Sequence, residues 1–178
     1  MYKAKYANSG SRSAFFIIDD GRGFKEFESH EDAAYARAVQ EKLAVFNLAP
    51  NVLSEVGKIR IFGKELSRWG FMTEIAEMIG CGGNECGCGE CNDLCDRYQP
   101  KINRLVREVF NKTDCDFMDN HIGNVGLITR KGKKKLVCID TGSESVYDAD
   151  LEAEYIGSYD SYSDGCCSCT VCRGSYNG

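Results

Sequence analysis

The sequence has no apolar run that approaches the roughly 20 residues of a membrane-spanning helix, and its first residues lead into no apolar segment like that of a secretory signal. It also lacks an excess of positive charge: 28% of its 178 residues are charged, and the net charge is -5. These absences exclude a membrane-embedded protein and a general nucleic-acid binder, so we expect a cytoplasmic protein with no membrane or nucleic-acid partner. The length suits one domain or two small lobes that share a cleft.

A β-hairpin is predicted over residues 125–139. Two short apolar runs, 125–128 and 136–139, flank a glycine-containing lysine turn at 131–135, which is typical of two antiparallel strands joined by a tight turn. We interpret the basic turn as a solvated hairpin tip, with a docking point for an acidic partner as the other interpretation.

Polar side chains stand at the two open ends of this hairpin. Asp119 and Asn124 precede the first strand, and Asp140 follows the second. The hairpin should bring all three side chains to one edge. Two carboxylates and an amide oxygen form a hard ligand set that suits Mg²⁺ carrying phosphates. The simpler alternative is an ordinary hairpin in which Asp119 caps a turn and Asp140 starts a loop.

The spacing of these residues resembles the protein-kinase-like superfamily, nearer its aminoglycoside and choline phosphotransferase branch than the regulated protein kinases. Asp119 and Asn124 match the Asp-x-x-x-x-Asn of a kinase catalytic loop, and Asp140-Thr141-Gly142 stands where kinases have Asp-Phe-Gly. The resemblance implies that Asp119 accepts the proton of an attacking hydroxyl and that Asn124 and Asp140 hold Mg²⁺.

The resemblance also implies a five-stranded antiparallel sheet and one helix in the first part of the chain. Strands are expected at 2–7, 12–18, 24–27, 53–61 and 65–73, and a helix at 29–46. The loop Ser9-Gly10-Ser11 would close over the phosphates of the nucleotide, and Lys25 on the third strand would contact them. The segment Thr73-Glu74-Ile75 resembles the hinge, whose backbone groups hydrogen-bond adenine.

In kinases the strand lysine pairs with a glutamate on the helix that follows. Alignment puts Gln40 near the glutamate position with Glu41 next to it, whereas Glu31 lies more than two turns earlier. We predict Glu41 as the partner of Lys25. The alternative is that all three residues lie on the exposed surface of the helix.

Most of the eleven cysteines fall into two clusters, which favours metal binding over disulfides in a reducing compartment. Cys138 lies outside both clusters and is predicted to be a small buried apolar residue. Two Cys-x-x-Cys pairs have the spacing of a zinc knuckle, and the two clusters could share one or two Zn²⁺ ions. The predicted Zn²⁺ ligands are Cys81, Cys86, Cys88, Cys91 and Cys95 in an insert, and Cys166, Cys167, Cys169 and Cys172 in the tail.

The predicted fold class is α+β: a protein-kinase-like two-lobed fold whose N-lobe has the five-stranded antiparallel sheet and one helix. Its parts would be an N-lobe and hinge at 1–78, a Cys-rich zinc-binding insert at 79–97, a truncated C-lobe with the catalytic hairpin at 98–157, and a Cys-rich tail at 158–178. One C-lobe helix would begin at Pro100 and another would span 146–156. We expect neither the activation segment nor the docking helices of regulated protein kinases in the residues after Gly142.

These features predict a minimal phosphotransferase that uses ATP and Mg²⁺, contains Zn²⁺, and acts on an acceptor that the sequence does not identify, a protein being one candidate. The alternative is a catalytically impaired pseudokinase that acts as a nucleotide-binding or zinc-stapled interaction module. A phosphate loop with one glycine favours the alternative, as does Phe117, which replaces the histidine that kinases have two residues before the catalytic Asp. The presence of Asp119, Asn124 and Asp140 together favours the enzyme.

Overall fold

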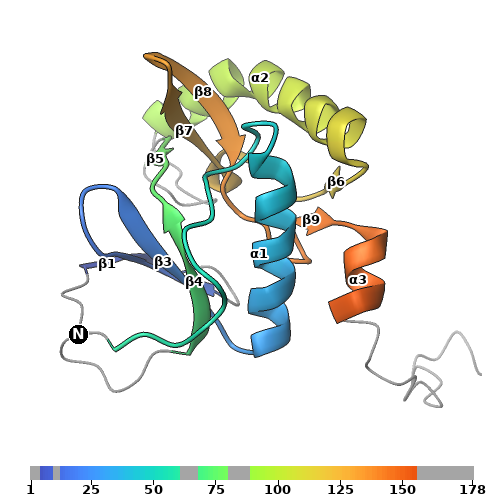
Figure 1. Cartoon of the computed structure of the whole chain (residues 1–178). Coiled ribbons are helices and arrows are strands. Elements are labelled where there is room, and N and C mark those ends of the chain that lie inside the picture. The colour runs from blue at the N-terminus through green and yellow to red at the C-terminus, as the bar shows by residue number, and fades with distance from the viewer. Residues whose placement is uncertain (1–4, 10–12, 61–67, 80–88, 156–178) are drawn as a thin grey trace, which may run out of the picture.

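The structure is a computed structural model that describes residues 5–9, 13–60, 68–79 and 89–155. Within these residues the fold is mixed α and β, with small antiparallel sheets and three α-helices. In Figure 1 a four-stranded sheet lies at the lower left, the β7–β8 hairpin and α2 lie above it, and α1 runs between the sheet and α3. In the part of the chain that is described, no helix combines the length and apolar character needed to cross a membrane.

The first sheet is antiparallel and has the strand order β1-β2-β3-β4. Its strands are β1 (Lys5–Ser9), β2 (Ser13–Ile17), β3 (Arg22–Phe27) and β4 (Trp69–Glu74). The turn between β2 and β3 is fixed by Asp19, whose Oδ1 accepts hydrogen bonds from the backbone N–H groups of Gly21 at 3.2 Å and Arg22 at 2.9 Å. This local bond is the usual way in which aspartate stabilises a turn.

The predicted fifth strand at 53–61 is not formed as a strand in the described residues. Within the described residues, this part of the chain makes isolated bridges to β4 at Val52 with Thr73 and at Gly57 with Gly70. Between them Ser54 turns its hydroxyl to the sheet and accepts a hydrogen bond from the Met72 N–H at 2.9 Å. A side chain thus replaces a backbone partner, and the described sheet has four strands where five were predicted.

Helix α1 (His30–Ala44) agrees with the predicted helix. Ser29 is its N-cap and accepts a hydrogen bond from the Asp32 N–H at 2.9 Å. One face packs on the first sheet, where Ala33 and Ala36 join Phe27 and Phe71 in a buried cluster. The buried residues of the helix are Ala33, Tyr35, Ala36, Val39, Gln40 and Leu43.

Helix α2 (Gly89–Thr113) begins well before the predicted start at Pro100, so that prediction was wrong. Proline removes one backbone N–H from a helix interior, which is unfavourable by itself. The helix continues across it because Tyr98 on the N-terminal side packs against the same buried cluster as Ile102 and Leu105. The second half of the predicted insert 79–97 is therefore helical.

The predicted hairpin is confirmed as β7 (Val125–Arg130) and β8 (Lys133–Cys138), in register from Val125–Cys138 to Arg130–Lys133. Lys131 (φ 50°) and Gly132 (φ 74°) form the two-residue turn, in which both residues are left-handed as in a type I′ hairpin. The short strand β5 (Glu77–Met78) pairs with β7.

The chain after the hairpin is joined to α1 by a buried polar cluster. Strand β6 (Asp116–Phe117) pairs with β9 (Val146–Tyr147), and α3 (Ala149–Tyr155) follows, so the expected helix at 146–156 starts later than predicted. Asp148 is 2% exposed, and its Oδ1 accepts hydrogen bonds from two backbone N–H groups at the start of α3. Its Oδ2 lies 2.5 Å from the Lys42 Nζ.

Candidate functional site

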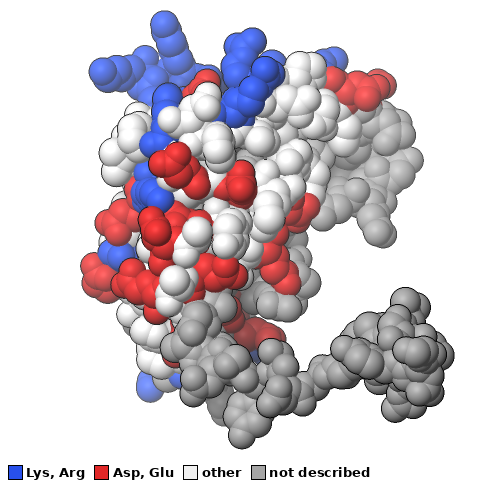
Figure 2. All heavy atoms as spheres, turned by 90° about the vertical axis from the view of Figure 1, so that its right-hand side faces the viewer, with Lys and Arg blue, Asp and Glu red and all other residues white. Residues whose placement is uncertain are grey.

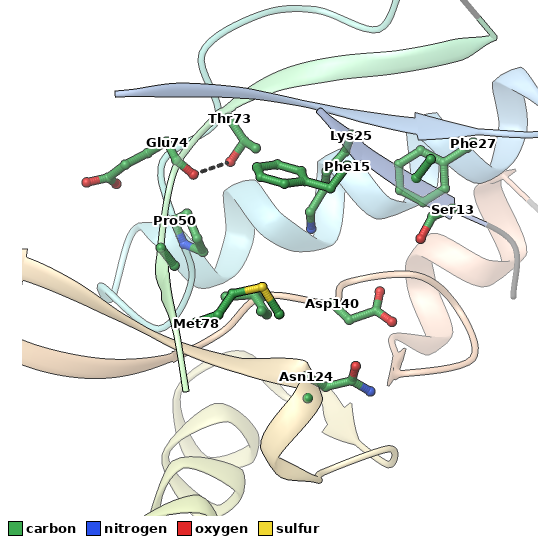
Figure 3. A pocket seen from close by; sticks show the side chains of 14 residues that line it. Ser13, Phe15, Lys25, Phe27, Pro50, Thr73, Glu74, Met78, Asn124 and Asp140 are labelled. Carbon is green, nitrogen blue, oxygen red and sulfur yellow. Dashed lines mark hydrogen bonds between the residues drawn. The ribbon is translucent and has the colours of Figure 1, made fainter. Parts of the chain in front are cut away.

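The candidate site is an open pocket between the first sheet and the base of the β7–β8 hairpin (Figure 3). Its empty volume is about 800 Å³, a figure that includes space open to solvent. Residues from both ends of the described chain line it. They include Ser13, Phe15 and Lys25 from the sheet and Asn124, Ile139 and Asp140 from the hairpin base.

Lys25 reaches the pocket from β3 and is held by hydrogen bonds on its ammonium group. Its Nζ donates to the Gln40 Oε1 at 2.9 Å and to the Thr141 Oγ1 at 3.4 Å. Burial lowers the pKa of Lys25, and the negative charge of Asp140 acts in the opposite direction. The carboxylate across the pocket therefore favours the charged form of this lysine.

The predicted pairing of Lys25 with Glu41 is wrong, because Gln40 occupies the partner position. Gln40 is fully buried, and its Nε2 donates to the Pro50 carbonyl at 3.0 Å and to the Thr73 Oγ1 at 2.5 Å. Consecutive residues on a helix point in directions about 100° apart. Glu41 therefore faces solvent and accepts a hydrogen bond from the Arg37 Nη1 at 3.1 Å.

The hairpin brings Asn124 and Asp140 to the same edge, as predicted. The Ile139 N–H donates to the Asn124 carbonyl at 2.9 Å, so Asp140 follows directly after a residue bonded to Asn124. The carboxylate of Asp140 accepts hydrogen bonds from the Gly142 N–H at 3.2 Å and the Ser145 hydroxyl at 2.8 Å. Both side chains line the pocket beneath Lys25 in Figure 3.

Asp119 does not line the pocket itself but is hydrogen-bonded to Asn124, which does. The Asn124 Nδ2 donates to the Asp119 Oδ2 at 2.8 Å and to the Asp119 carbonyl at 3.0 Å. The Asp119 side chain is 51% exposed, so an external hydroxyl can reach it. The predicted group of Asp119, Asn124 and Asp140 is thus gathered at one end of the hairpin.

His121 is a further residue of this site, and the sequence interpretation missed it. Its Nε2 lies 3.3 Å from the Asp119 Oδ1, and its Nδ1 accepts a hydrogen bond from the Gly123 N–H at 3.0 Å. A neutral imidazole that accepts at Nδ1 carries its proton on Nε2, the nitrogen that faces Asp119. The available signal was the spacing Asp119-Asn120-His121, which puts an imidazole within one turn of the carboxylate.

The predicted hinge lies against the pocket, but its backbone is partly engaged elsewhere. Thr73 and Glu74 line the pocket, and Thr73 is buried. The Glu74 N–H donates to the Asn51 carbonyl at 2.9 Å and the Ile75 N–H donates to the Gly21 carbonyl at 3.3 Å. These two amide groups are therefore already used within the protein.

The predicted phosphate loop is only partly covered by the structure. Ser9 ends β1, and Gly10 and Ser11 lie outside the described residues. Ser13, at the start of β2, lines the pocket instead. The prediction that residues 9–11 contact phosphates stays a prediction.

Most of the predicted zinc ligands lie outside the described residues: Cys81, Cys86, Cys88, Cys166, Cys167, Cys169 and Cys172. Cys91 and Cys95 are on α2, and Cys95 has a free thiol. Within the part of the chain that is described, no group of three or more His, Cys, Asp or Glu residues could hold a metal ion by itself. Zinc binding stays a prediction. Cys138 is fully buried, as expected of a small apolar residue.

Of the predicted turn 131–135, only Lys131 and Gly132 form the tip of the hairpin; the lysines at 133–135 lie on β8, paired with β7. Lysine and arginine side chains gather at the upper end of the molecule in Figure 2, the end at which Figure 1 shows this tip. Lys131 and Lys133 are exposed, and Lys134 lies 2.5 Å from the Glu77 carboxylate. The tip is solvated, as predicted.

Comparison of the chain with protein-family models, curated proteins and solved structures gives no match.

Proposed function

We propose that the protein is a minimal kinase-like phosphotransferase that transfers the terminal phosphoryl group of ATP to an acceptor hydroxyl. The observation that carries the proposal is that Asn124 and Asp140, brought together by the hairpin register, line one pocket with Lys25. The three residues come from two segments about 100 residues apart in the chain. Phosphoryl transfer depends mainly on positioning and charge neutralisation, which such a constellation can supply.

The oxygen donors of the pocket fit a magnesium ion that is shared with a nucleotide. Mg²⁺ is commonly bound through one or two protein carboxylates, with phosphate oxygens and water as its other ligands. Asp140 offers a carboxylate and Asn124 an amide oxygen, whose orientation is set because the Nδ2 is bonded to Asp119. When bound, the ion would neutralise charge on the phosphates. A cluster of three acidic protein ligands is not required for this use.

The protein residues have separate tasks in the proposed reaction. Lys25 provides a fixed positive charge for phosphate oxygens, because Gln40 and Thr141 hold its ammonium group. Asp119 accepts the proton of the acceptor hydroxyl. The hydroxyl oxygen forms a bond to the terminal phosphorus, the bond from that phosphorus to the bridging oxygen breaks, and ADP leaves with the electron pair.

The test compares two carboxylate variants with a matched control. Asp140→Asn should abolish detectable binding of Mg-ATP in calorimetry, whereas Asp119→Asn should retain binding and lose about 10²- to 10⁴-fold in transfer of radiolabelled phosphate. Asp116→Asn changes an exposed aspartate on β6 and should behave as wild type. Unchanged binding and turnover in Asp140→Asn would refute the proposal.

A second candidate is a nucleotide-binding module without phosphoryl transfer. It is favoured by Gln40, because a neutral amide next to Lys25 gives no ion pair of the kind that a glutamate would form. This candidate predicts that the wild-type protein binds Mg-ATP but transfers no label to itself, to water or to added acceptors. Turnover that is lost in Asp119→Asn would exclude it.

A further inference from the structure

Phe15 is an aromatic residue whose side chain faces the pocket because of the way β2 pairs with β3. It lies on β2 directly opposite Lys25 on β3, and residues in direct register on neighbouring strands point to the same face. Both side chains line the pocket. The next residue, Phe16, points to the other face and is 3% exposed in a separate apolar cluster. Alternation along the strand therefore leaves one of two adjacent phenylalanines available to a ligand.

Gly23 leaves the space that the Phe15 ring occupies. A Cβ atom at Gly23 would lie 2.0 Å from the Phe15 Cζ and 2.5 Å from its Cε2, which no side chain could tolerate without moving the ring. Gly23 does not have a positive φ, so its backbone conformation does not demand glycine. What this glycine provides is space, which the tip of the Phe15 ring occupies.

The pocket has an apolar part and a polar part. In Figure 3 Phe15 and Met78 face each other across the pocket, with Pro50 at the same end. Glu74 also lies at this end, where its carboxylate is bonded to Arg130. Asn124 and Asp140 lie away from Pro50 in this view. A ligand with a planar apolar group at one end and a metal-bound anionic chain at the other matches this division.

We propose that the Phe15 ring, which lies over Gly23, stacks against the base of the nucleotide and supplies a large part of the protein's affinity for the nucleotide. This inference rests on the proposed function, since it assigns the polar end of the pocket to the phosphates. Stacking suits this site because the N–H groups of Glu74 and Ile75 are engaged with Asn51 and Gly21. Aromatic stacking on a base needs no donor from the protein.

The experiment compares two ligands that share a polyphosphate chain but differ in the base. Binding of Mg-ATP and of magnesium tripolyphosphate is measured by calorimetry for the full wild-type chain and for its Phe15→Leu and Phe15→Trp variants. Phe15→Leu should weaken Mg-ATP binding by about 5-fold or more, the lower end of the effect of removing a base-stacking aromatic. Its affinity for tripolyphosphate should stay unchanged, and Phe15→Trp should keep the affinity for Mg-ATP.

Two further variants control the result. Phe46→Leu changes a phenylalanine that is 40% exposed and does not line the pocket, and should alter neither affinity. Gly23→Ala should displace the ring and weaken Mg-ATP selectively. Should Gly23→Ala fail to fold by circular dichroism, the two Phe15 variants still decide the question.

The outcomes separate this inference from the proposed function. Equal wild-type affinity for Mg-ATP and tripolyphosphate, or equal weakening of both by Phe15→Leu, overturns the stacking role and leaves the phosphate site intact. Failure of the wild-type protein to bind either ligand overturns the proposed function and the stacking role with it.

Discussion

Replacement of Gln40 by methionine tests how the candidate site is held together. Methionine has nearly the volume of glutamine but cannot make its hydrogen bonds. Gln40 is 0% exposed and bonds to Lys25, Pro50 and Thr73. The substitution removes the donor to the buried Pro50 carbonyl and the acceptor of the Lys25 ammonium.

The expected cost follows from these lost partners. A buried polar group left without its partner costs about 1–3 kcal/mol. Thr73 keeps a hydrogen bond to the Asn51 carbonyl at 3.2 Å, and Lys25 keeps its contact with Thr141. These two groups therefore do not cost the full free energy of an unpaired buried group. We expect Gln40→Met to lower the free energy of unfolding by roughly 2–4 kcal/mol. Mg-ATP binding should weaken about tenfold, because Lys25 loses its main anchor.

Glu41→Met is the matched control, since it changes the adjacent helix residue in the same way. The Glu41 side chain is 58% exposed and forms a surface ion pair with Arg37, so its loss should change stability by less than about 0.5 kcal/mol. Urea unfolding under reducing conditions and calorimetry with Mg-ATP would measure both effects. Loss of stability and binding in Glu41→Met, with Gln40→Met unaffected, would refute the assignment of Gln40.

Three further predictions concern residues away from Lys25. Burial raises the pKa of Asp148, but hydrogen bonds from Lys42 and from the start of α3 outweigh this effect and leave the pKa below its usual value. The ionised carboxylate therefore stabilises the folded protein above pH 3.8, and this contribution is lost as the pH falls through the lowered pKa. Asp148→Asn should therefore flatten the acid limb of the stability profile in urea titrations, and an unchanged limb would contradict this. His121→Asn should lower kcat about tenfold with KM unchanged, because it removes the imidazole whose Nε2 lies 3.3 Å from the Asp119 Oδ1; an equal change in KM would indicate a different role. Metal analysis of protein purified under reducing conditions should find bound zinc, and a metal-free, disulfide-bonded protein would disprove the zinc prediction.

The local elements of this fold could be predicted from the sequence alone. The two apolar runs and the Lys131-Gly132 turn dictate the hairpin, and Ser29 marks the start of α1. Such features depend on neighbouring residues, whose backbone preferences and hydrogen bonds act over a few positions. The meeting of Asn124 and Asp140 was predictable for the same reason, because the hairpin register fixes it.

Contacts between distant segments were decided by the tertiary structure. Whether Gln40 or Glu41 meets Lys25 depends on which face α1 buries against the sheet, and residues one position apart in the chain differ in that respect. The position of the Phe15 ring over Gly23 depends on the pairing of β2 with β3. The sequence thus determined which chemical groups reach the hairpin end of the pocket, whereas packing decided which residues they contact. The physical reason is that burial selects one helix face and one strand register out of several that local preferences allow.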